Sequence, residues 1–365
     1  MVKFLFSFLF VSCVTVAGFA QQGFKITGHL GGTLGGELVL VASGANGLVK
    51  LDEAVMVNGD FEFSGNVEGI VPAYILTGGQ QQQQIAILML ENLEYTLVSG
   101  ESGIEVQGGG DSQKIWNEFD AINKRIKREN MLMEQESRAA YAQQNQMKLQ
   151  TLQQQFQKVL EEMGAKQEEL FRIHKDSPVT AFVIATGMKQ MDYTSLKTVY
   201  DGLGEPAKNS LYGQAIAQQL TVFKRVEVGS VAPDFKGVTV TGDTVSLHGI
   251  QAKVKLIDFW ASWCGPCRQE MPNVCKVYKK YHDSGLEIVG VSLDEKRDAW
   301  VKAIEEMEMK WPNISDLQGW RSGFAALYLV RGIPHMVLLD ENNRIVAKNL
   351  RGKELEKKIA ELLEK

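Results

Sequence analysis

The sequence is poor in cysteine and lacks any block of basic residues. Its 365 residues include four cysteines, and acidic residues outnumber basic ones to give a formal net charge of −5. Without a run of Lys or Arg to follow a phosphate backbone, the chain is not expected to bind nucleic acid. A secreted scaffold held together by disulfides would carry many more cysteines. Beyond the N-terminus, no stretch is apolar for long enough to cross a bilayer.

Potential metal ligands are also sparse. The five histidines are scattered, and the only close pair of cysteines is Cys264 and Cys267 in a single C-G-P-C motif. A structural zinc site normally takes four ligands, often from two Cys-rich knuckles, so this pattern disfavours zinc. We expect neither a metal nor an organic cofactor.

One long apolar run is present, at the N-terminus. Lys3 is followed by FLFSFLFVSCVTVAGFA, which has about the length of a signal-peptide core and ends in small residues. We expect residues 1–20 to be a signal peptide that is cleaved after Ala20, and the mature protein to be exported to the periplasm or cell envelope. A retained membrane anchor and lipidation at Cys13 are the alternatives. Loss of Cys13 would leave three cysteines, an odd number.

The next part of the chain has the pattern of short strands. FKITGHL, GELVLVA, GDFEFSG and EYTLVSG are among the apolar-alternating stretches between Gly, Asn and Asp turn signals. Asn58 and Gly59 form a hairpin signature within VNGDFEF. These patterns predict an antiparallel β domain of sandwich type over residues 21–110.

Residues 111–226 have the pattern of helices. Apolar residues at spacings of three and four form two stripes: Ile115, Phe119, Ile122 and Ile126, and then Leu149, Leu152, Phe156, Val159 and Met163. The stripes predict two long helices or one helical hairpin. A third helix should start in DSPVTAFVIA, with Asp176 or Ser177 as its cap and Pro178 in its first turn. Whether this segment is a spacer or an interaction surface stays open.

Strands and helices alternate over residues 227–365. KVKLIDFWA, LEIVGVSLD and HMVLLDENNRIVAKNL read as strands, and helices are expected from about Cys264, near 296–309, and from about Lys353. This order predicts an α/β domain in which helices cover both faces of a mixed sheet.

A redox centre is the interpretation that best accounts for the C-G-P-C motif. Cys264 should lie at a helix N-terminus, where unpaired N–H groups and the helix dipole favour the attacking thiolate. It should be the more exposed thiol, whereas Cys267, one turn further in, should be shielded and able to resolve a mixed disulfide. Pro266 is tolerated in this first turn. A structural disulfide is the alternative.

Two residues outside the motif fit this interpretation. Asp258 lies six residues before Cys264 in an otherwise apolar strand, so we expect it to be buried below the cysteines and to exchange a proton with Cys267. An edge-strand carboxylate that faces water is the alternative. Pro334 directly precedes a strand, where a cis bond would shape a substrate-facing turn.

The stretches KLIDFWASWCGPCRQEMP, EIVGVSLDE, GIPHMVLLDENNRI and VGSVAPDF together resemble the thioredoxin superfamily, and more closely the exported TlpA/ResA-like thiol–disulfide oxidoreductases. The resemblance covers about residues 229–365. It implies that Cys264 is the nucleophile, Cys267 the resolving thiol, Asp258 the buried acid and Pro334 the cis-proline. The front half is similar to N-terminal extensions of such proteins in bacteria with two membranes.

One position departs from the family pattern. Many thioredoxins carry a lysine near the buried acid on the neighbouring strand, and Gly290 stands there in this chain. The proton relay is therefore expected to differ from that of thioredoxin.

Further residues are expected around the thiols. The candidates for substrate contact are Trp263, Gly265, Pro266, Ile333 and His335. Arg268 and Glu270 follow the motif and could tune the thiols, although solvated helix charges are more common. Trp311 and Trp320 are expected to pack onto the fold rather than to line a groove.

The third cysteine of the mature chain is expected to be a free thiol. Cys275 lies eight residues beyond Cys267 on what should be one helix. A rise of about 12 Å would separate them, too far for a disulfide.

The protein is expected to be an exported enzyme that reduces protein disulfides. A thiolate attacks the substrate disulfide, a mixed disulfide forms, and Cys267 resolves it. The Gly-Pro dipeptide between the cysteines matches reducing members of the family. The expected partners are disulfide-containing envelope proteins and a membrane thiol donor or another redox partner, and the oligomeric state stays open. The alternatives are a disulfide isomerase or oxidase, or an envelope binding module that uses the thioredoxin fold as a scaffold.

Overall fold

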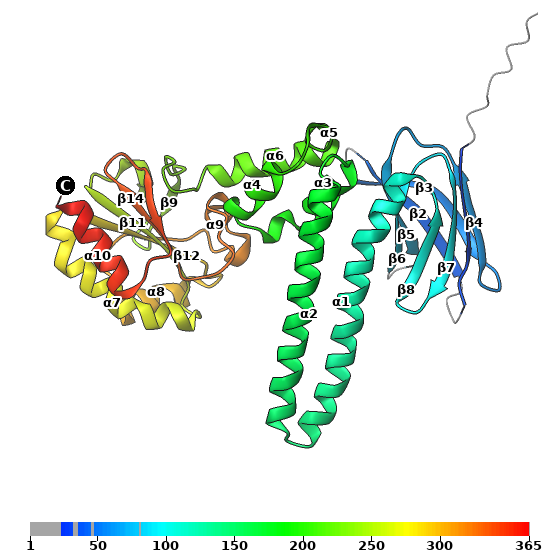
Figure 1. The fold of residues 1–365 in the computed structure, drawn as a ribbon. Coiled ribbons are helices and arrows are strands. Elements are labelled where there is room, and N and C mark those ends of the chain that lie inside the picture. Colours follow the sequence, from blue (N-terminus) through cyan, green and yellow to red (C-terminus); the bar gives the residue numbers. More distant parts are fainter. Residues whose placement is uncertain (1–22, 32–35, 45–46, 80–81, 365) are drawn as a thin grey trace, which may run out of the picture. The chain divides into compact units, whose positions relative to one another are not determined.

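The computed structural model describes residues 23–31, 36–44, 47–79 and 82–364 (Figure 1). It contains two compact units. The first ends at Thr186 and also includes Asp201–Gly213, and the second comprises Gly187–Tyr200 and Gln214–Lys365. The expected signal peptide at 1–20 lies outside the described residues, as does Cys13. The domain boundaries expected at residues 110 and 226 stay predictions, and the compact units do not follow them.

Two four-stranded sheets form the β domain of the first unit. Their strand orders are β4-β1-β7-β8 and β3-β2-β5-β6. The strands are β1 (Phe24–His29), β2 (Gly36–Gly44), β3 (Gly47–Met56), β4 (Asp60–Gly65), β5 (Val71–Thr77), β6 (Gln84–Leu90), β7 (Glu94–Gly100) and β8 (Gly103–Gly108). Neighbouring strands are antiparallel except β1 and β7, which are parallel. Side chains from both sheets share one apolar core, so the predicted β sandwich is confirmed with this one parallel pair.

The Asn-Gly signature forms a tight turn, but not a two-stranded hairpin. Asn58 and Gly59 have φ values of 53° and 91°, the left-handed conformation that Asn and Gly adopt most readily, and Val57 pairs with Asp60 across the turn. The arms of the turn, β3 and β4, belong to different sheets. The turn is therefore a corner of the sandwich.

Helices follow the β domain. They are α1 (Asp111–Ala142), α2 (Gln146–Ile173), α3 (Pro178–Gly187), the 3-10 helix η1 (Met188–Gln190), α4 (Tyr193–Asp201), α5 (Glu205–Asn209) and α6 (Leu211–Lys224). Helices α1 and α2 run side by side as the predicted hairpin (Figure 1). Part of each apolar stripe is buried, including Phe119 and Met163. Helix α3 starts at Pro178 as expected, and the Ser177 hydroxyl accepts a hydrogen bond from the backbone N of Val179.

A mixed five-stranded sheet forms the centre of the second unit, in the order β13-β12-β11-β14-β15. Its strands are β11 (Val254–Trp260), β12 (Leu286–Ser292), β13 (Asn313–Ile314), β14 (His335–Asp340) and β15 (Ile345–Lys348), and a separate small sheet holds β9 (Lys236–Val238) and β10 (Thr244–Ser246). Strand β11 is buried at every position and pairs in parallel with β12 and antiparallel with β14. A central strand that is buried along its whole length is expected in a sheet whose two faces are both covered by helices.

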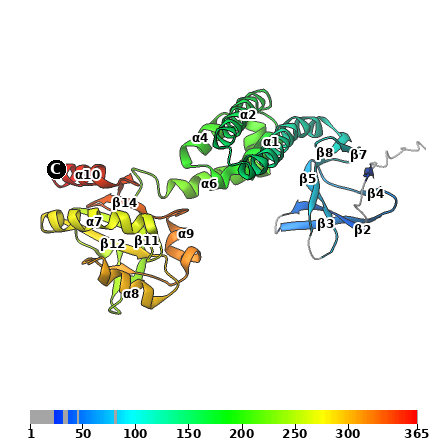
Figure 2. The same cartoon turned by 90° about the horizontal axis from the view of Figure 1, so that it is seen from below.

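Helices cover the two faces of this sheet. They are α7 (Gly265–Tyr281), α8 (Arg297–Glu306), α9 (Gly323–Leu327) and α10 (Gly352–Leu363), with the 3-10 helices η2 (Leu247–Gly249), η3 (His282–Ser284) and η4 (Gly319–Arg321). Figure 2 shows α7 and α10 on one face and α8 on the other. The predicted α/β domain is confirmed. Among the described parts of the chain, no helix is both long and apolar enough for a membrane span.

Candidate redox site

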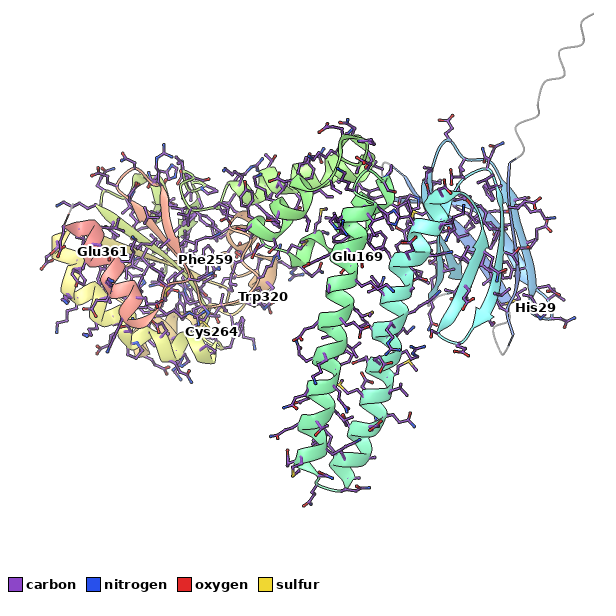
Figure 3. The ribbon with its side chains drawn as sticks, viewed as in Figure 1. His29, Glu169, Phe259, Cys264, Trp320 and Glu361 are labelled. Atoms are coloured by element: carbon purple, nitrogen blue, oxygen red, sulfur yellow. A yellow bond between two sulfur atoms is a disulfide. The ribbon has the colours of Figure 1, made fainter. Side chains whose placement is uncertain are left out.

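A disulfide joins Cys264 and Cys267 at the start of α7 (Figure 3). Cys264 is the N-cap of the helix, and its Sγ accepts a hydrogen bond of 3.1 Å from the backbone N of Cys267. Pro266 falls in the first turn, where an N–H would have no partner in the helix. The N–H groups and the positive end of the helix dipole therefore point at the Cys264 sulfur. This arrangement favours a thiolate once the disulfide is reduced.

Both sulfur-bearing residues are nearly buried in this oxidised form. Cys264 is 4% exposed and Cys267 is 2% exposed. Cys264 was expected to be the more exposed thiol, and the observed difference between the two is small. The open part of the surface is the backbone of Gly265, where an added Cβ would have nothing within 4 Å. A partner can therefore approach the disulfide over this glycine.

Exposed tryptophans stand beside the disulfide. Trp263 is 54% exposed and Trp320 is 52% exposed, with their ring centroids 6.3 Å apart. Trp320 was expected to pack onto the fold rather than to line a groove, but η4 leaves its ring half exposed at the surface next to Trp263. Trp311 is buried, as expected. The two exposed rings form an apolar surface at the edge of the redox site.

The loop before β14 lies next to the disulfide. The Ile333–Pro334 peptide bond is cis, and the carbonyl O of Ile333 lies 3.7 Å from the Sγ of Cys264. Arg351 donates a hydrogen bond of 2.9 Å from its Nη2 to the carbonyl O of Pro334. Sequence reasoning missed Arg351, because it lies far along the chain in no recognisable motif. It ties the cis-proline loop to the start of α10.

Asp258 is the buried acid that the sequence predicts. Its side chain on β11 is 1% exposed, and its Oδ1 has no hydrogen-bond partner. The pKa of this carboxyl is raised from 3.8 to about 7, mainly by burial and also by the negative charge of Glu270, while the positive charge of Arg351 opposes the rise. The group can therefore bind or release a proton near neutral pH.

The strand position opposite Asp258 has no room for a lysine. Gly290 is the partner of Asp258 on β12, and an added Cβ there would lie 1.9 Å from the Oδ1 of Asn313. Asn313 is fixed by a hydrogen bond of 3.1 Å from the Nε1 of Trp260. The cation that acts on the Asp258 carboxyl is Arg351 instead.

The two charged residues that follow the motif differ in their surroundings. Glu270 accepts hydrogen bonds of 2.8 Å from the backbone N of Gly352 and from the Nδ2 of Asn273, which ties α7 to α10. Arg268 pairs with Glu306 at 3.1 Å, with both side chains more than two-fifths exposed. Arg268 is thus a solvated helix charge, whereas Glu270 acts electrostatically on the buried acid.

Another buried carboxylate, missed by sequence reasoning, holds the turn before the motif. Asp294 is 1% exposed, and its Oδ2 accepts hydrogen bonds from the backbone N of Ser262 at 2.9 Å and from the Oγ of Ser292 at 2.7 Å. The signal in the sequence is an acid directly after the apolar strand IVGVSL. Asp294 fixes the loop that leads from β11 to Cys264.

His335 follows the cis-proline and packs edge-on against Phe259, with ring centroids 5.9 Å apart. The pKa of its imidazole is lowered from 6.5 to about 4, mainly by burial and also by the positive charges of Lys348 and Arg351. The ring is therefore neutral near pH 7.

Cys275 is a free thiol, as expected. In the described ranges, no group of three or more His, Cys, Asp or Glu side chains is placed to hold a metal ion.

Comparison with known proteins agrees with this site. The Redoxin family matches residues 227–363, and a domain of unknown function, DUF4369, matches residues 24–115. The thioredoxin-like protein YneN of Bacillus subtilis is 37% identical over 123 residues, which are 33% of this chain and 69% of the relative. The thiol-disulfide oxidoreductase ResA of Bacillus thuringiensis is 28% identical over 142 residues, 39% of this chain and 80% of the relative.

A crystal structure of the thioredoxin domain of a thiol-disulfide oxidoreductase from Bacteroides vulgatus is also similar, with 36% identity, a TM-score of 0.36, and coverage of 38% of this chain and 98% of that one. The site and the sequence relatives together define a thioredoxin-like thiol–disulfide oxidoreductase. The chain belongs to the TlpA/ResA-like group of the thioredoxin superfamily.

Proposed function

We propose that the protein reduces disulfide bonds of exported proteins through the Cys264–Cys267 dithiol. The observation that carries the proposal is this cysteine pair at the N-terminus of α7, beside the cis-proline loop. The Gly265-Pro266 dipeptide between the cysteines supports net reduction, because it matches the reducing members of the family.

The proposed cycle begins with the reduced protein. The Cys264 thiolate attacks one sulfur of the substrate disulfide, so that a Cys264–substrate bond forms, the substrate S–S bond breaks, and the second substrate sulfur leaves as a thiolate and takes a proton. Cys267 then loses its proton and attacks the Cys264 sulfur. The protein disulfide forms, and the first substrate sulfur leaves as a thiolate. The substrate gains two electrons that the dithiol loses, and an external thiol donor must reduce the protein again.

Asp258 is the proposed proton acceptor for Cys267. A carboxyl whose pKa is raised to about 7 can take a proton from a thiol and return it near neutral pH. Its unpartnered Oδ1 supports this role, because a purely structural carboxylate in an apolar core would be expected to have its hydrogen bonds satisfied.

Substrate contact is proposed for the residues around the disulfide: Trp263, Gly265, Pro266, Ile333, Pro334 and His335. The proposed partners are disulfide-containing envelope proteins, with a membrane thiol donor or another redox partner supplying electrons. The apolar residues 4–20, expected to direct export, support action outside the cytoplasm.

Insulin reduction tests the proposal. The full chain with dithiothreitol as the donor should accelerate precipitation of the insulin B chain, and the Cys264→Ser variant should not differ from dithiothreitol alone. Cys275→Ala is the matched control, since it removes the free thiol and should keep the activity. Failure of the wild-type protein on insulin, together with refolding of scrambled ribonuclease, would favour an isomerase. Failure in both assays would favour a binding module.

A further inference from the structure

A cleft with a volume of about 550 Å³ lies beside the redox site. One wall is the cis-proline loop with the residues just before it, and a second is the chain between β15 and α10. The remaining wall comes from residues at and just before the start of α4 and at and just after the end of α6. All of these segments belong to the second compact unit. Residues 191–193, Phe223 and Val226 therefore add to the redox domain a surface that the Redoxin match, starting at residue 227, does not contain.

The cleft is directly connected to the disulfide through one residue. Ile333 lines the cleft, and its carbonyl O lies 3.7 Å from the Sγ of Cys264. A polypeptide whose disulfide reaches Cys264 must place neighbouring residues near this cleft, because consecutive Cα atoms are only about 3.8 Å apart. The cleft is thus within reach of a few substrate residues.

Charges in the cleft are only partly compensated. The Lys348 Nζ forms an ion pair with the Glu227 carboxylate, and Asp192 accepts a hydrogen bond of 2.7 Å from the backbone N of Ser195 at the start of α4. The remaining charged residues of the lining are Arg331 and Arg351. Neither arginine forms a salt bridge with any residue that the structure describes. With Asp192 and Glu227 as the anions and Lys348, Arg331 and Arg351 as the cations, the lining has a small positive balance on a chain with a net charge of −5.

Each of the two arginines is held in place while most of its donors stay available. Arg331 donates from Nη1 to the carbonyl O of Met191 at 3.2 Å and lies over the Phe223 ring, 5.4 Å from its centroid. Arg351 donates from Nη2 to the carbonyl O of Pro334 at 2.9 Å. A guanidinium has five N–H donors, and stacking on an aromatic ring leaves its edge free to bind a carboxylate.

We propose that this cleft recognises a carboxylate side chain of the substrate polypeptide, located a few residues from the disulfide under attack, and that Arg331 determines this preference. The inference rests on the proposed reductase function and adds the class of substrate sequence that the site prefers. The aromatic and aliphatic lining, including Phe223 and Val226, would pack on the carbon chain of a Glu or Asp whose carboxylate meets the arginines.

The test uses three synthetic peptides closed by one disulfide, which differ only in a Glu, Gln or Lys three residues from the first cysteine. The reduced full-length protein is mixed with each peptide, the reaction is followed by tryptophan fluorescence, and the second-order rate constant is obtained from the time course. For the wild type, the Glu peptide should react about threefold to tenfold faster than the Gln peptide, the range expected for one partly exposed charge-assisted contact.

Substitutions of Arg331 test whether this cleft causes the preference for the Glu peptide. Arg331→Gln should lower the Glu-to-Gln rate ratio about threefold, and Arg331→Glu should make the Lys peptide the faster substrate. Arg331 is exposed, so neither change threatens the fold. Lys357→Gln is the matched control: it removes one positive charge from an exposed position of α10 outside the cleft, and it should leave the ratio unchanged.

The outcomes separate this inference from the proposed function. Equal rates for the Glu and Gln peptides with the wild type would overturn the inference and leave the reductase function intact. A ratio that stays high in both Arg331 variants would overturn the assignment to this cleft. If the wild type reduced none of the three peptides, the proposed function itself would fail, and the inference with it.

Discussion

The core of the β domain and the core of the redox domain differ in the polar groups that they bury. The β-sandwich core holds apolar side chains such as Ile26, Phe63 and Leu97, together with Tyr95, whose buried hydroxyl donates a hydrogen bond to the carbonyl O of Met89. The buried charged residues among the described parts of the chain are Lys255, Asp258 and Asp294, and all three lie in the second unit. A buried charge destabilises a fold unless it is paired, so its presence indicates a purpose other than stability.

Within the redox domain, the three buried charges differ in turn. Lys255 donates a hydrogen bond of 2.6 Å to Asn343, and Asp294 accepts hydrogen bonds that fix the turn before Cys264. Asp258 alone among these three has a buried oxygen without a partner. The comparison therefore separates two structural charges from one that is available for proton transfer.

The largest expected effect is the loss of the nucleophile. Cys264→Ser should lower disulfide reduction at least about a thousandfold, because serine is not ionised near pH 7 and cannot replace the thiolate. Steady-state insulin reduction measures this effect. If the variant kept activity within about tenfold of the wild type, Cys264 would not be the nucleophile, and the redox domain would no longer be set apart from the β domain by its chemistry.

A core substitution in the β domain should affect stability and not chemistry. Phe63 is fully buried between the two sheets, so Phe63→Ala should destabilise the first unit by about 3–5 kcal/mol. Hydrogen exchange of peptides from β1 to β8 measures this loss, and the reduction of small disulfides should persist. Val55→Ala is the control, because Val55 is 63% exposed in the same domain and should change stability by less than about 0.5 kcal/mol.

Asp258→Asn should change activity and stability in opposite directions. Without the proton acceptor, the resolving step above pH 7 should slow about a hundredfold, and its rise with pH through about 7 should disappear. Rapid-mixing measurements at pH 6 and pH 8 give the profile. A variant that keeps the wild-type profile would assign the titration to another group.

The stability change follows from the pKa of Asp258. This pKa is about 7 in the folded protein and near 3.8 when unfolded, so the folded state binds the proton more tightly. The wild type should therefore lose up to about 4 kcal/mol of stability as the pH rises from about 4 to 8. Asp258→Asn should lack this loss and be the more stable protein at pH 8, as denaturant unfolding at the two pH values would reveal.

The smallest effect is expected at the exposed tryptophans. Trp320→Ala should slow the reduction of polypeptide disulfides about threefold, because it removes half of an apolar surface beside the disulfide. Trp320→Phe should restore most of the rate. An equal slowing of 2-hydroxyethyl disulfide, which is too small to reach the ring, would indicate an effect on the thiols instead.

Local sequence patterns predicted most of the redox domain. The strand–Cys264–helix arrangement and the burial of Asp258 depend on short stretches with strong propensities, whereas the cis bond at Pro334 was expected from the resemblance to the thioredoxin superfamily. In the β domain, the same approach missed β3 and β8, which are edge strands of their sheets. Each of these two strands has a single buried residue, Met56 in β3 and Val106 in β8, so apolar alternation is weak in them.

The cleft and Arg351 could not be predicted from the sequence. Arg331, Arg351 and Met191 come from separate segments, and only tertiary folding brings them to one surface. No local pattern distinguishes the exposed Trp320 from the buried Trp311, so the sequence did not show that the two rings differ in exposure.

The most direct test of the redox assignment is the trapping of mixed disulfides. The Cys264→Ala and Cys267→Ala variants are expressed, and free thiols are blocked with N-ethylmaleimide. Complexes that disappear on reduction with dithiothreitol are then quantified on non-reducing gels. Cys267→Ala should accumulate complexes joined through Cys264, because no internal thiol resolves them, whereas Cys264→Ala should trap almost none. Equal trapping by the two variants, or trapping by Cys264→Ala alone, would contradict Cys264 as the nucleophile and Cys267 as the resolving thiol.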